Sequence, residues 1–471
     1  MNTATLSAAL GLTDALQPGR PTHIVVFRRP RTGNVATLSR ALGDTGKAMS
    51  VAGRPGLLTS AASAPVAFNY YERFGVAAVT LDEAQRRELV THADVEGVYA
   101  NLMRSIPRPV SSPDAMSPAM APAMAPAFSP VPLAAPGVAH PSAAHPGAAH
   151  SITEAYLMGM LAAASGALQA LRLAPEPAPG VEAAAAKVSG KLSWALQAIG
   201  ITSKTKWTGK GVKVAVLDTG VDQNHPDLKG RIVAYRNFAA GSSDNDVVQH
   251  GTHCAGVIAG SSRPVGGVRY GVAPGVSLIV AKVLGDDGRG WDDDIIEAMD
   301  WAVDQGARVL SMSLGAPRAV NQPFSASYEQ LASNFAQTTP GVLIVAAAGN
   351  DSQRPAMLAP VGNPAACPSI MSVAALDAQR QVAWFSCAAL DSVGGVDVAA
   401  PGVDVLSAQP GGSTQLMDGT SMATPHVAGL AALYLQKTPS LTAPKLWLAL
   451  KGRCVPAGLA SDVGTGLVQV P

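Results

Sequence analysis

The stretch DGTSMATPHVAGLAALYLQ, residues 418–436, joins a polar, glycine-containing start to a long apolar run. Apolar residues recur from Met422 to Leu435 at helical spacing, which predicts an apolar helix that begins at or near Ser421. A helix N-terminus has unpaired backbone N–H groups and a partial positive charge, and both favour an oxyanion. Serine at such a position is more often a cap than a nucleophile, so the rest of the chain must decide its role.

Five apolar runs before this helix set the fold class. They are nearly continuous and rich in β-branched residues, which is typical of strands buried on both faces of a parallel sheet. The runs cover 212–218, 276–284, 307–314, 342–349 and 370–376, and a helical pattern covers 291–305. The sequence therefore predicts an α/β domain over residues 187–471, with helices on both faces of a parallel sheet and functional residues beyond the carboxyl ends of its strands.

Length and charge limit the remaining possibilities. A chain of 471 residues is too long for one typical domain. Lys and Arg number 34 against 33 acids, a net charge of +1, which argues against a nucleic-acid partner. The first twenty residues lack a basic start followed by a continuous apolar core, so no classical signal peptide is visible. The location stays open between export by another route and the cytoplasm, and a monomer is expected.

The chain before residue 187 divides by composition. After an N-terminal extension, 1–21, strand and helix patterns alternate over 22–106 and fit a small α+β fold of the split βαβ kind. A Pro- and Ala-rich linker follows at 107–150, then a helix and second linker at 151–186. The helix is short and Ala-rich for a membrane span, so no membrane association is expected. Histidines at 140, 145 and 150 lie on a proline-broken chain, which does not favour a metal site.

The four cysteines do not indicate a disulfide or zinc-binding framework. Cys254, Cys367, Cys387 and Cys454 are widely spaced and form no CxxC pair, so neither a zinc ribbon nor a disulfide scaffold is indicated. Buried free thiols are the favoured interpretation, and the pairing state remains open.

Four polar residues follow apolar runs and together indicate chemistry. Asp218 ends the run in AVLDTGVD, His250 begins HGTHCAGVIAG, Asn350 follows AAAG, and Ser421 begins the C-terminal helix. Each alone is better explained as a turn or cap residue. Together they supply a nucleophile, a base, a carboxylate that orients the base, and an amide donor for an oxyanion. HGTH lacks the glutamate and the spacing of HExxH, which argues against zinc.

The segments DTGVDQNHPDL, HGTHCAGVIAG, AAAGN and GTSMATPHVAG together resemble the subtilisin-like serine peptidases. The resemblance implies a triad in which Asp218 orients the imidazole, His250 is the general base and acid, and Ser421 attacks the carbonyl. It also implies that Asn350 and the Ser421 N–H bind the oxyanion. His253 would be structural, and the HGTHCAG variant resembles the proteinase K branch, which places the Cys254 thiol beside the catalytic histidine.

The resemblance also implies where peptide binds. Two edges, GDDGRG (285–290) and SLGA (313–316), would receive substrate as an added strand. The primary pocket would be walled by 313–315 and 347–349. These segments contain the expected substrate-binding residues Gly288, Gly290, Ser313, Leu314, Gly315, Ala348 and Gly349.

Two departures from the family concern acids and metals. Acids at 292–294 stand where the family tends to carry an aromatic rim; we interpret them as an exposed helix start rather than as a preference for basic substrates. No cofactor is expected to be required. The loop 260–268 contains Arg263 and Pro264 and lacks the Asn-rich ligands of many relatives, so a structural calcium ion is possible but cannot be assigned.

Residues 22–106 resemble the inhibitory propeptide of these peptidases, through VAAVTLDEAQRRELVTHADVEGVYANL. This implies a ferredoxin-like prodomain whose tail lies in the active site of a zymogen until a cut between Leu102 and His150. The long separation from the peptidase domain leaves the cut unlocated. The expected partners are protein or peptide substrates and this propeptide. The alternative is a catalytically latent protein that uses the fold to bind peptides.

Overall fold

The computed structural model describes residues 20–31, 33–42, 50–51, 68–107 and 192–471. We call the described residues up to 107 the N-terminal region and those from 192 the C-terminal region. The expected N-terminal extension (apart from its last two residues), both linkers (apart from Pro107), the helix after residue 150 and the three linker histidines lie outside the described residues.

A seven-stranded sheet forms the centre of the C-terminal region. All its neighbouring strands pair in parallel, in the order β14-β13-β12-β11-β7-β9-β8. The strands are β7 (Lys213–Asp218), β8 (Ile232–Asn237), β9 (Ser277–Lys282), β11 (Val309–Met312), β12 (Leu343–Ala347), β13 (Met371–Leu376) and β14 (Val398–Pro401). The five apolar runs of the sequence all become strands, because their side chains are buried on both faces of the sheet.

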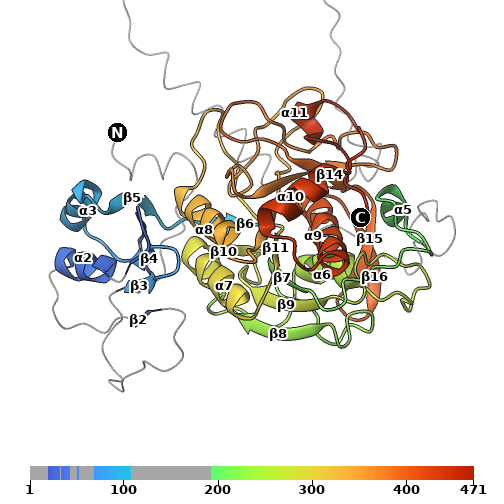
Figure 1. Cartoon of the computed structure of the whole chain (residues 1–471), viewed down its shortest axis with the longest axis horizontal. Helices are drawn as coiled ribbons and strands as arrows, with labels where there is room; N and C mark the ends of the chain where they lie inside the picture. The colour runs from blue at the N-terminus through green and yellow to red at the C-terminus, as the bar shows by residue number, and fades with distance from the viewer. Residues whose placement is uncertain (1–19, 32, 43–49, 52–67, 108–191) are drawn as a thin grey trace, which may run out of the picture. The chain divides into compact units, whose positions relative to one another are not determined.

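Helices cover both faces of this sheet. Figure 1 shows α7 and α8 on one side of β7 and β11, and α6 and α9 on the other. The helices of the region are α5 (Trp194–Ala198), α6 (His250–Ala259), α7 (Asp292–Asp304), α8 (Ala326–Gln337), α9 (Thr420–Lys437), α10 (Ala443–Lys451) and α11 (Ala460–Val463). No helix within the described residues has the length and apolar character needed to cross a membrane.

Several strands of the C-terminal region were not predicted from the sequence. The edge strand β8 is only half-buried, so it has no continuous apolar run. A hairpin of β15 (Val405–Gln409) and β16 (Ser413–Met417) contacts α6, and neither strand showed a clear pattern. The short strand β10 (Arg289–Trp291) lies outside the main sheet.

The N-terminal region contains a five-stranded sheet in the order β2-β3-β4-β1-β5. β1 pairs antiparallel with both β4 and β5, and β3 pairs antiparallel with β4. Its elements are β1 (His23–Phe27), α2 (Gly33–Ala41), β2 (Ser50–Val51), β3 (Phe68–Tyr71), β4 (Val76–Val79), α3 (Glu83–Thr91), β5 (Val95–Ala100) and β6 (Met103–Ser105). Asp82 and Gln85 form a capping box that starts α3.

The two faces of this smaller sheet bury different side chains. One face packs with α2 and α3 in a core that includes Phe27 and Leu38. On the other side of the sheet, Ile24 of β1 and Phe74 of the turn between β3 and β4 join the large core of the C-terminal region. There the ring of Phe74 meets that of Phe335 in α8 edge to face, with centroids 4.6 Å apart. The N-terminal region thus shares a core with α8, and its last strand, β6, pairs with β10.

Candidate active site

Asp218 and His250 form the first contact of the site. Asp218 is the last residue of β7, in the middle of the sheet, and its carboxylate is buried. His250 is the first residue of α6, and its Nδ1 donates to Asp218 Oδ1 across 2.7 Å. Burial alone would lower the pKa of His250, but the neighbouring Asp218 carboxylate outweighs it and raises this pKa well above 6.5. The pair therefore stabilises an imidazolium.

Asp246 fixes the start of the histidine helix, a role that the sequence analysis missed. Its Oδ1 accepts from the Gln249 N–H and its Oδ2 from the Thr252 N–H, so it serves as an N-terminal cap from outside the helix. Thr219 donates its hydroxyl to the same carboxylate and accepts from the Gly251 N–H. Since Thr219 follows Asp218, these bonds fix the position of the His250 imidazole relative to the Asp218 carboxylate.

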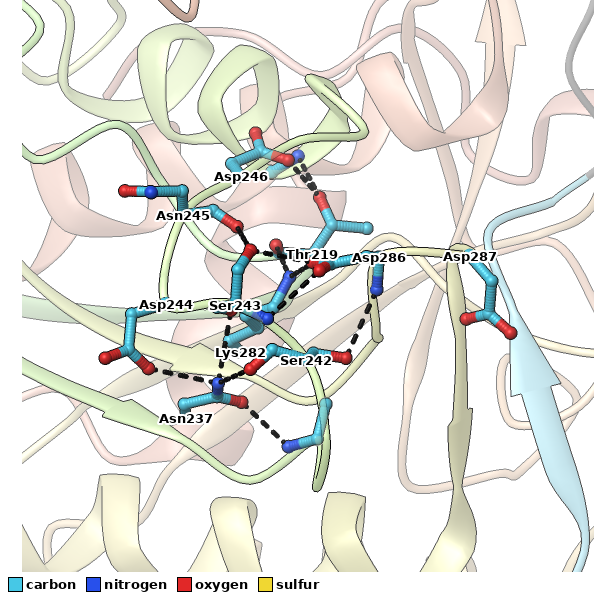
Figure 2. A network of polar contacts seen from close by, with 12 residues as sticks. Thr219, Asn237, Ser242, Ser243, Asp244, Asn245, Asp246, Lys282, Asp286 and Asp287 are labelled. Atoms are coloured by element: carbon cyan, nitrogen blue, oxygen red, sulfur yellow. Dashed lines mark hydrogen bonds and ion pairs between the residues drawn. The ribbon is translucent and has the colours of Figure 1, made fainter.

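A buried lysine connects this hydrogen-bond network to the neighbouring loops (Figure 2). Lys282, at the end of β9, donates its Nζ to the Thr219 carbonyl at 2.6 Å and pairs with Asp286 Oδ1 at 3.1 Å. Asp286 also accepts from the N–H and hydroxyl of Ser243. The loops after β8 and β9 are therefore tied to the strand end that carries Asp218.

Ser421 is the second residue of α9. Pro425 has no N–H to pair with the Ser421 carbonyl, which instead accepts from Ser313 Oγ at 2.8 Å and from the Cys254 thiol at 3.5 Å. The same thiol lies 4.0 Å from His250 Nδ1, so Cys254 lies between the histidine and the serine. Ser421 Oγ contacts the Ser313 carbonyl at 3.5 Å, and the described residues contain no hydrogen bond between this hydroxyl and His250.

Asn350 lies beside Ser421, although it precedes Ser421 by 71 positions in the chain. Its Oδ1 accepts from both the N–H and the hydroxyl of Thr420, which fixes the orientation of the amide. A Cβ placed on Gly419 would lie 3.2 Å from Asn350 Nδ2 and 3.5 Å from the Ser421 nitrogen. Both donors therefore border one point in space, as the binding of an oxyanion requires. Gly419 has φ 151°, a conformation that favours glycine.

Strand β6 of the N-terminal region lies between the two expected peptide-binding edges. On one side β6 pairs antiparallel with β10, where Gly290 faces Arg104. On the other side Ser105 and Gly315 exchange two backbone bonds, of 3.1 and 2.8 Å. The Ile106 N–H also donates to the Gly288 carbonyl at 3.1 Å. The chain thus inserts its own strand where the sequence analysis expected substrate.

A cleft of about 390 Å³ lies beside this strand. Its lining includes Ile106 and Pro107 from the N-terminal region, and Gly315, Ala347 and Gly349 from the expected pocket walls. The side chains of the remaining expected residues, Ser313, Leu314 and Ala348, are buried behind this surface.

The sequence matches the family model described as the subtilase family over residues 209–454, more than half of the chain. The chain belongs to the subtilase family. It is 39% identical over 286 residues to an intracellular serine protease of Paenibacillus polymyxa, covering 58% of this chain and 83% of that protein. Subtilisin BL of Lederbergia lenta is 42% identical over 263 residues, covering 56% and 90%.

One solved structure, a cold adapted subtilisin-like serine proteinase, matches this subtilase with 32% sequence identity and a TM-score of 0.49, covering 59% of this chain and 97% of that one. The family resemblance stated from the sequence is confirmed by the family match. Assignment to the proteinase K branch stays a prediction.

The expectation of an exposed acidic helix start in this subtilase is wrong. Asp292, the first residue of α7, is only 2% exposed, and Asp293 is also buried. Residues of the N-terminal region cover them: Arg104 pairs with Asp292, and Arg20 bridges Asp293 and Asp294. These partners are far away in sequence, so the acidic run alone could not predict its own burial.

His253 and three of the four cysteines are buried, which fits a structural role. His253 Nε2 donates to the Val405 carbonyl, and burial lowers the pKa of His253 to about 3. All four cysteines are free; Cys254, Cys367 and Cys387 are buried, whereas Cys454 is half-buried, contrary to expectation. Among the described residues, Asp218, His250 and Cys254 are the one cluster whose ligand atoms approach closely enough to hold a metal ion, and they coincide with the candidate active site.

Proposed function

We propose that this subtilase is a serine endopeptidase that hydrolyses peptide bonds of proteins through an acyl-enzyme on Ser421. The observation that carries the proposal is the buried Asp218–His250 hydrogen bond at the same sheet edge as Ser421 and Asn350. Serine protease relatives at about 40% identity support the same activity. Ser421, His250 and Asp218 are the catalytic residues in this proposal.

The proposed chemistry assigns one task to each group. His250 Nε2 takes the proton of Ser421 Oγ while that oxygen attacks the peptide carbonyl carbon. The oxyanion of the tetrahedral intermediate accepts hydrogen bonds from Asn350 Nδ2 and the Ser421 N–H. The imidazolium, stabilised by Asp218, then gives its proton to the leaving amine. Water attacks the acyl-enzyme with His250 again as base, which releases the acid and restores the serine.

We further propose that the N-terminal region is an inhibitory, ferredoxin-like prodomain and that the enzyme is made as a zymogen. The antiparallel order β3-β4-β1-β5, with one helix after β1 and another after β4, supports the fold. The position of β6 between Gly290 and Gly315 supports inhibition, because it occupies both edges that a substrate strand would use.

The register of β6 supports a position for the proposed cut. Ser105 faces Gly315, so two residues further along an antiparallel pair Pro107 faces Ser313. The Ser313 carbonyl lies 3.5 Å from Ser421 Oγ. The proposed scissile bond is therefore the one that follows Pro107, at the start of the proposed linker.

The occupied cleft also supports a second candidate function, a latent peptide-binding protein from which the N-terminal region never departs. The two candidates make opposite predictions for a fluorophosphonate probe, which labels only an activated serine. The full-length chain, with processing checked by mass, is incubated with the probe; Ser421→Ala is the control. We expect labelling of the processed wild type at Ser421. A folded, processed wild type without label would refute the peptidase and leave the binding protein.

A further inference from the structure

Arg104 occupies a closed pocket in the C-terminal region. Its side chain is only 5% exposed, and its Nε and Nη2 donate to the two oxygens of Asp292 at 2.6 and 2.9 Å. The guanidinium carbon lies 5.6 Å from the ring centroid of Tyr328. The arginine thus meets both a carboxylate and an aromatic face, the two surfaces that suit its planar cation.

The pocket is held in shape by the C-terminal region itself. Tyr328 donates its hydroxyl to Asp292 Oδ1 at 2.9 Å, which fixes the carboxylate beside the ring. Asp292 also begins α7, so its carboxylate lies at the partially positive end of the helix dipole. Without a cation, this carboxylate would lose its one charged partner, so any substrate that supplies a cation gains binding free energy there.

The position of this pocket along the cleft follows from the register of β6. Arg104 faces Gly290 on β10, and it precedes Pro107, the residue that faces Ser313, by three positions. A substrate strand that replaced β6 in the same register would place the fourth residue before the scissile bond in this pocket. Its main chain would bind the same two edges.

We propose that Asp292 and Tyr328 make this subtilase select arginine at the fourth substrate residue before the scissile bond. The inference rests on the proposed peptidase function and names the substrate class for that site: extended peptides or proteins with an arginine at this position. Lysine fits less well, because an ammonium group cannot form the side-on, two-bond contact that Arg104 makes. In the zymogen, Arg104 occupies the pocket in the manner of such a substrate.

The test uses processed wild-type enzyme and four fluorogenic peptides that differ at one residue, the fourth before the cut. That residue is arginine, lysine, citrulline or leucine. Citrulline keeps the shape of arginine without its charge. We expect kcat/KM for arginine to exceed that for citrulline by about 10- to 100-fold, the range for a hydrogen-bonded charged contact. Lysine should fall between the two.

Variants then assign the preference to the pocket. Asp292→Asn should reduce the arginine-to-citrulline ratio to near one, and Tyr328→Phe should reduce it partly. Glu297→Gln is the matched control, because it removes a charge from the same helix at a residue that pairs with Arg236 away from the pocket. If Asp292→Asn fails to fold because Arg104 loses its partner, the wild-type peptide series and Tyr328→Phe still decide.

Active-site titration distinguishes a failure of the arginine pocket from a failure of the proposed peptidase function. Titratable enzyme that cleaves arginine and citrulline peptides equally would overturn the arginine pocket and leave the peptidase intact; Arg104 would then serve only to join the two regions. Processed protein that neither titrates nor cleaves would overturn the proposed function, and the substrate preference with it. An arginine preference that survives Asp292→Asn would also overturn the assignment to this pocket.

Discussion

Asp218, His250 and Ser421 come from three different elements, and only their combination explains the proposed reaction. Replacing any one of them by alanine is expected to lower kcat/KM for a peptide substrate by about 10⁴-fold or more, a magnitude known from subtilisin and carried over to this relative. The losses should not add, because the three residues act as one unit. Steady-state kinetics of purified, folded variants measure this. A triple variant as impaired as the product of the three single losses would contradict it.

Asn350 acts through a donor that meets the oxyanion mainly in the transition state. Asn350→Ala should therefore lower kcat by about 10²- to 10³-fold with little change in KM, a magnitude also known from subtilisin. Thr420 holds the amide through its hydroxyl, so Thr420→Val should give a smaller loss of the same kind. An effect confined to KM would refute the role of Asn350.

The pH dependence of the reaction should reflect the pKa of His250, which Asp218 raises. The base must be neutral, and Asp218 raises the pKa of His250 above 6.5 by stabilising the imidazolium. Activity is therefore lost as the pH falls through this raised pKa and is fully present above it. We expect kcat/KM to rise with pH along a limb whose midpoint lies above 6.5. Asp218→Asn should shift the limb of its residual activity to lower pH; an unshifted limb would argue against the assignment.

At the scale of elements, β6 is proposed to inhibit by pairing with two edges at once. Ser105→Pro removes the N–H that donates to the Gly315 carbonyl, whereas Ser105→Ala keeps it. After self-cleavage, the proline variant should release its N-terminal fragment sooner, which shortens the lag before peptide hydrolysis begins. The alanine variant should retain the wild-type lag. Equal lags in all three proteins would show that the main-chain pairing of β6 does not control release.

At the scale of the whole molecule, acids buried between the two regions should make their association depend on pH. Burial, assisted by Asp293, raises the pKa of Asp294 to about 7, although Arg20 opposes the shift. Burial likewise raises the pKa of Asp300 to about 7, against the influence of Arg73. These carboxyls would return toward an ordinary pKa near 4 on separation. The associated form therefore binds more protons between about pH 4 and 7, so association should strengthen as the pH falls from about 7 to 4, and this contribution is lost as the pH rises through 7, with little further change above it.

This dependence can be measured without self-digestion. A Ser421→Ala chain with a protease site inserted at residues 120–135 is cut and run on a size-exclusion column at pH 5.5, 7 and 8.5. The fraction of N-terminal fragment that co-elutes with the C-terminal region should fall as the pH rises. Asp294→Asn with Asp300→Asn should flatten the trend. Tighter association at pH 8.5 than at pH 5.5 would show that the ion pairs with Arg20 and Arg73 outweigh the cost of burial.

The parallel sheet and the candidate catalytic residues could be predicted from the sequence. Strands such as β7 and β12 are buried on both faces, so their apolar character is continuous and is visible locally. The four polar residues of the site follow such runs or begin helices, and their motifs are long enough to indicate the family. Asp246 lacked such a signal, because its role depends on backbone N–H groups rather than on a pattern.

The role of the acidic start of α7 could not be predicted from the sequence and depends on tertiary contacts. Asp292 and Arg104 are 188 residues apart, and neither has a local pattern that names the other. A solvated helix start and a buried ion pair share the same sequence signature, since acids at a helix N-terminus are favourable in both. The difference depends on whether another segment covers the carboxylate. Strand β6 covers it. Main-chain bonds hold β6 in place, and any sequence without proline at the donor positions can form such bonds.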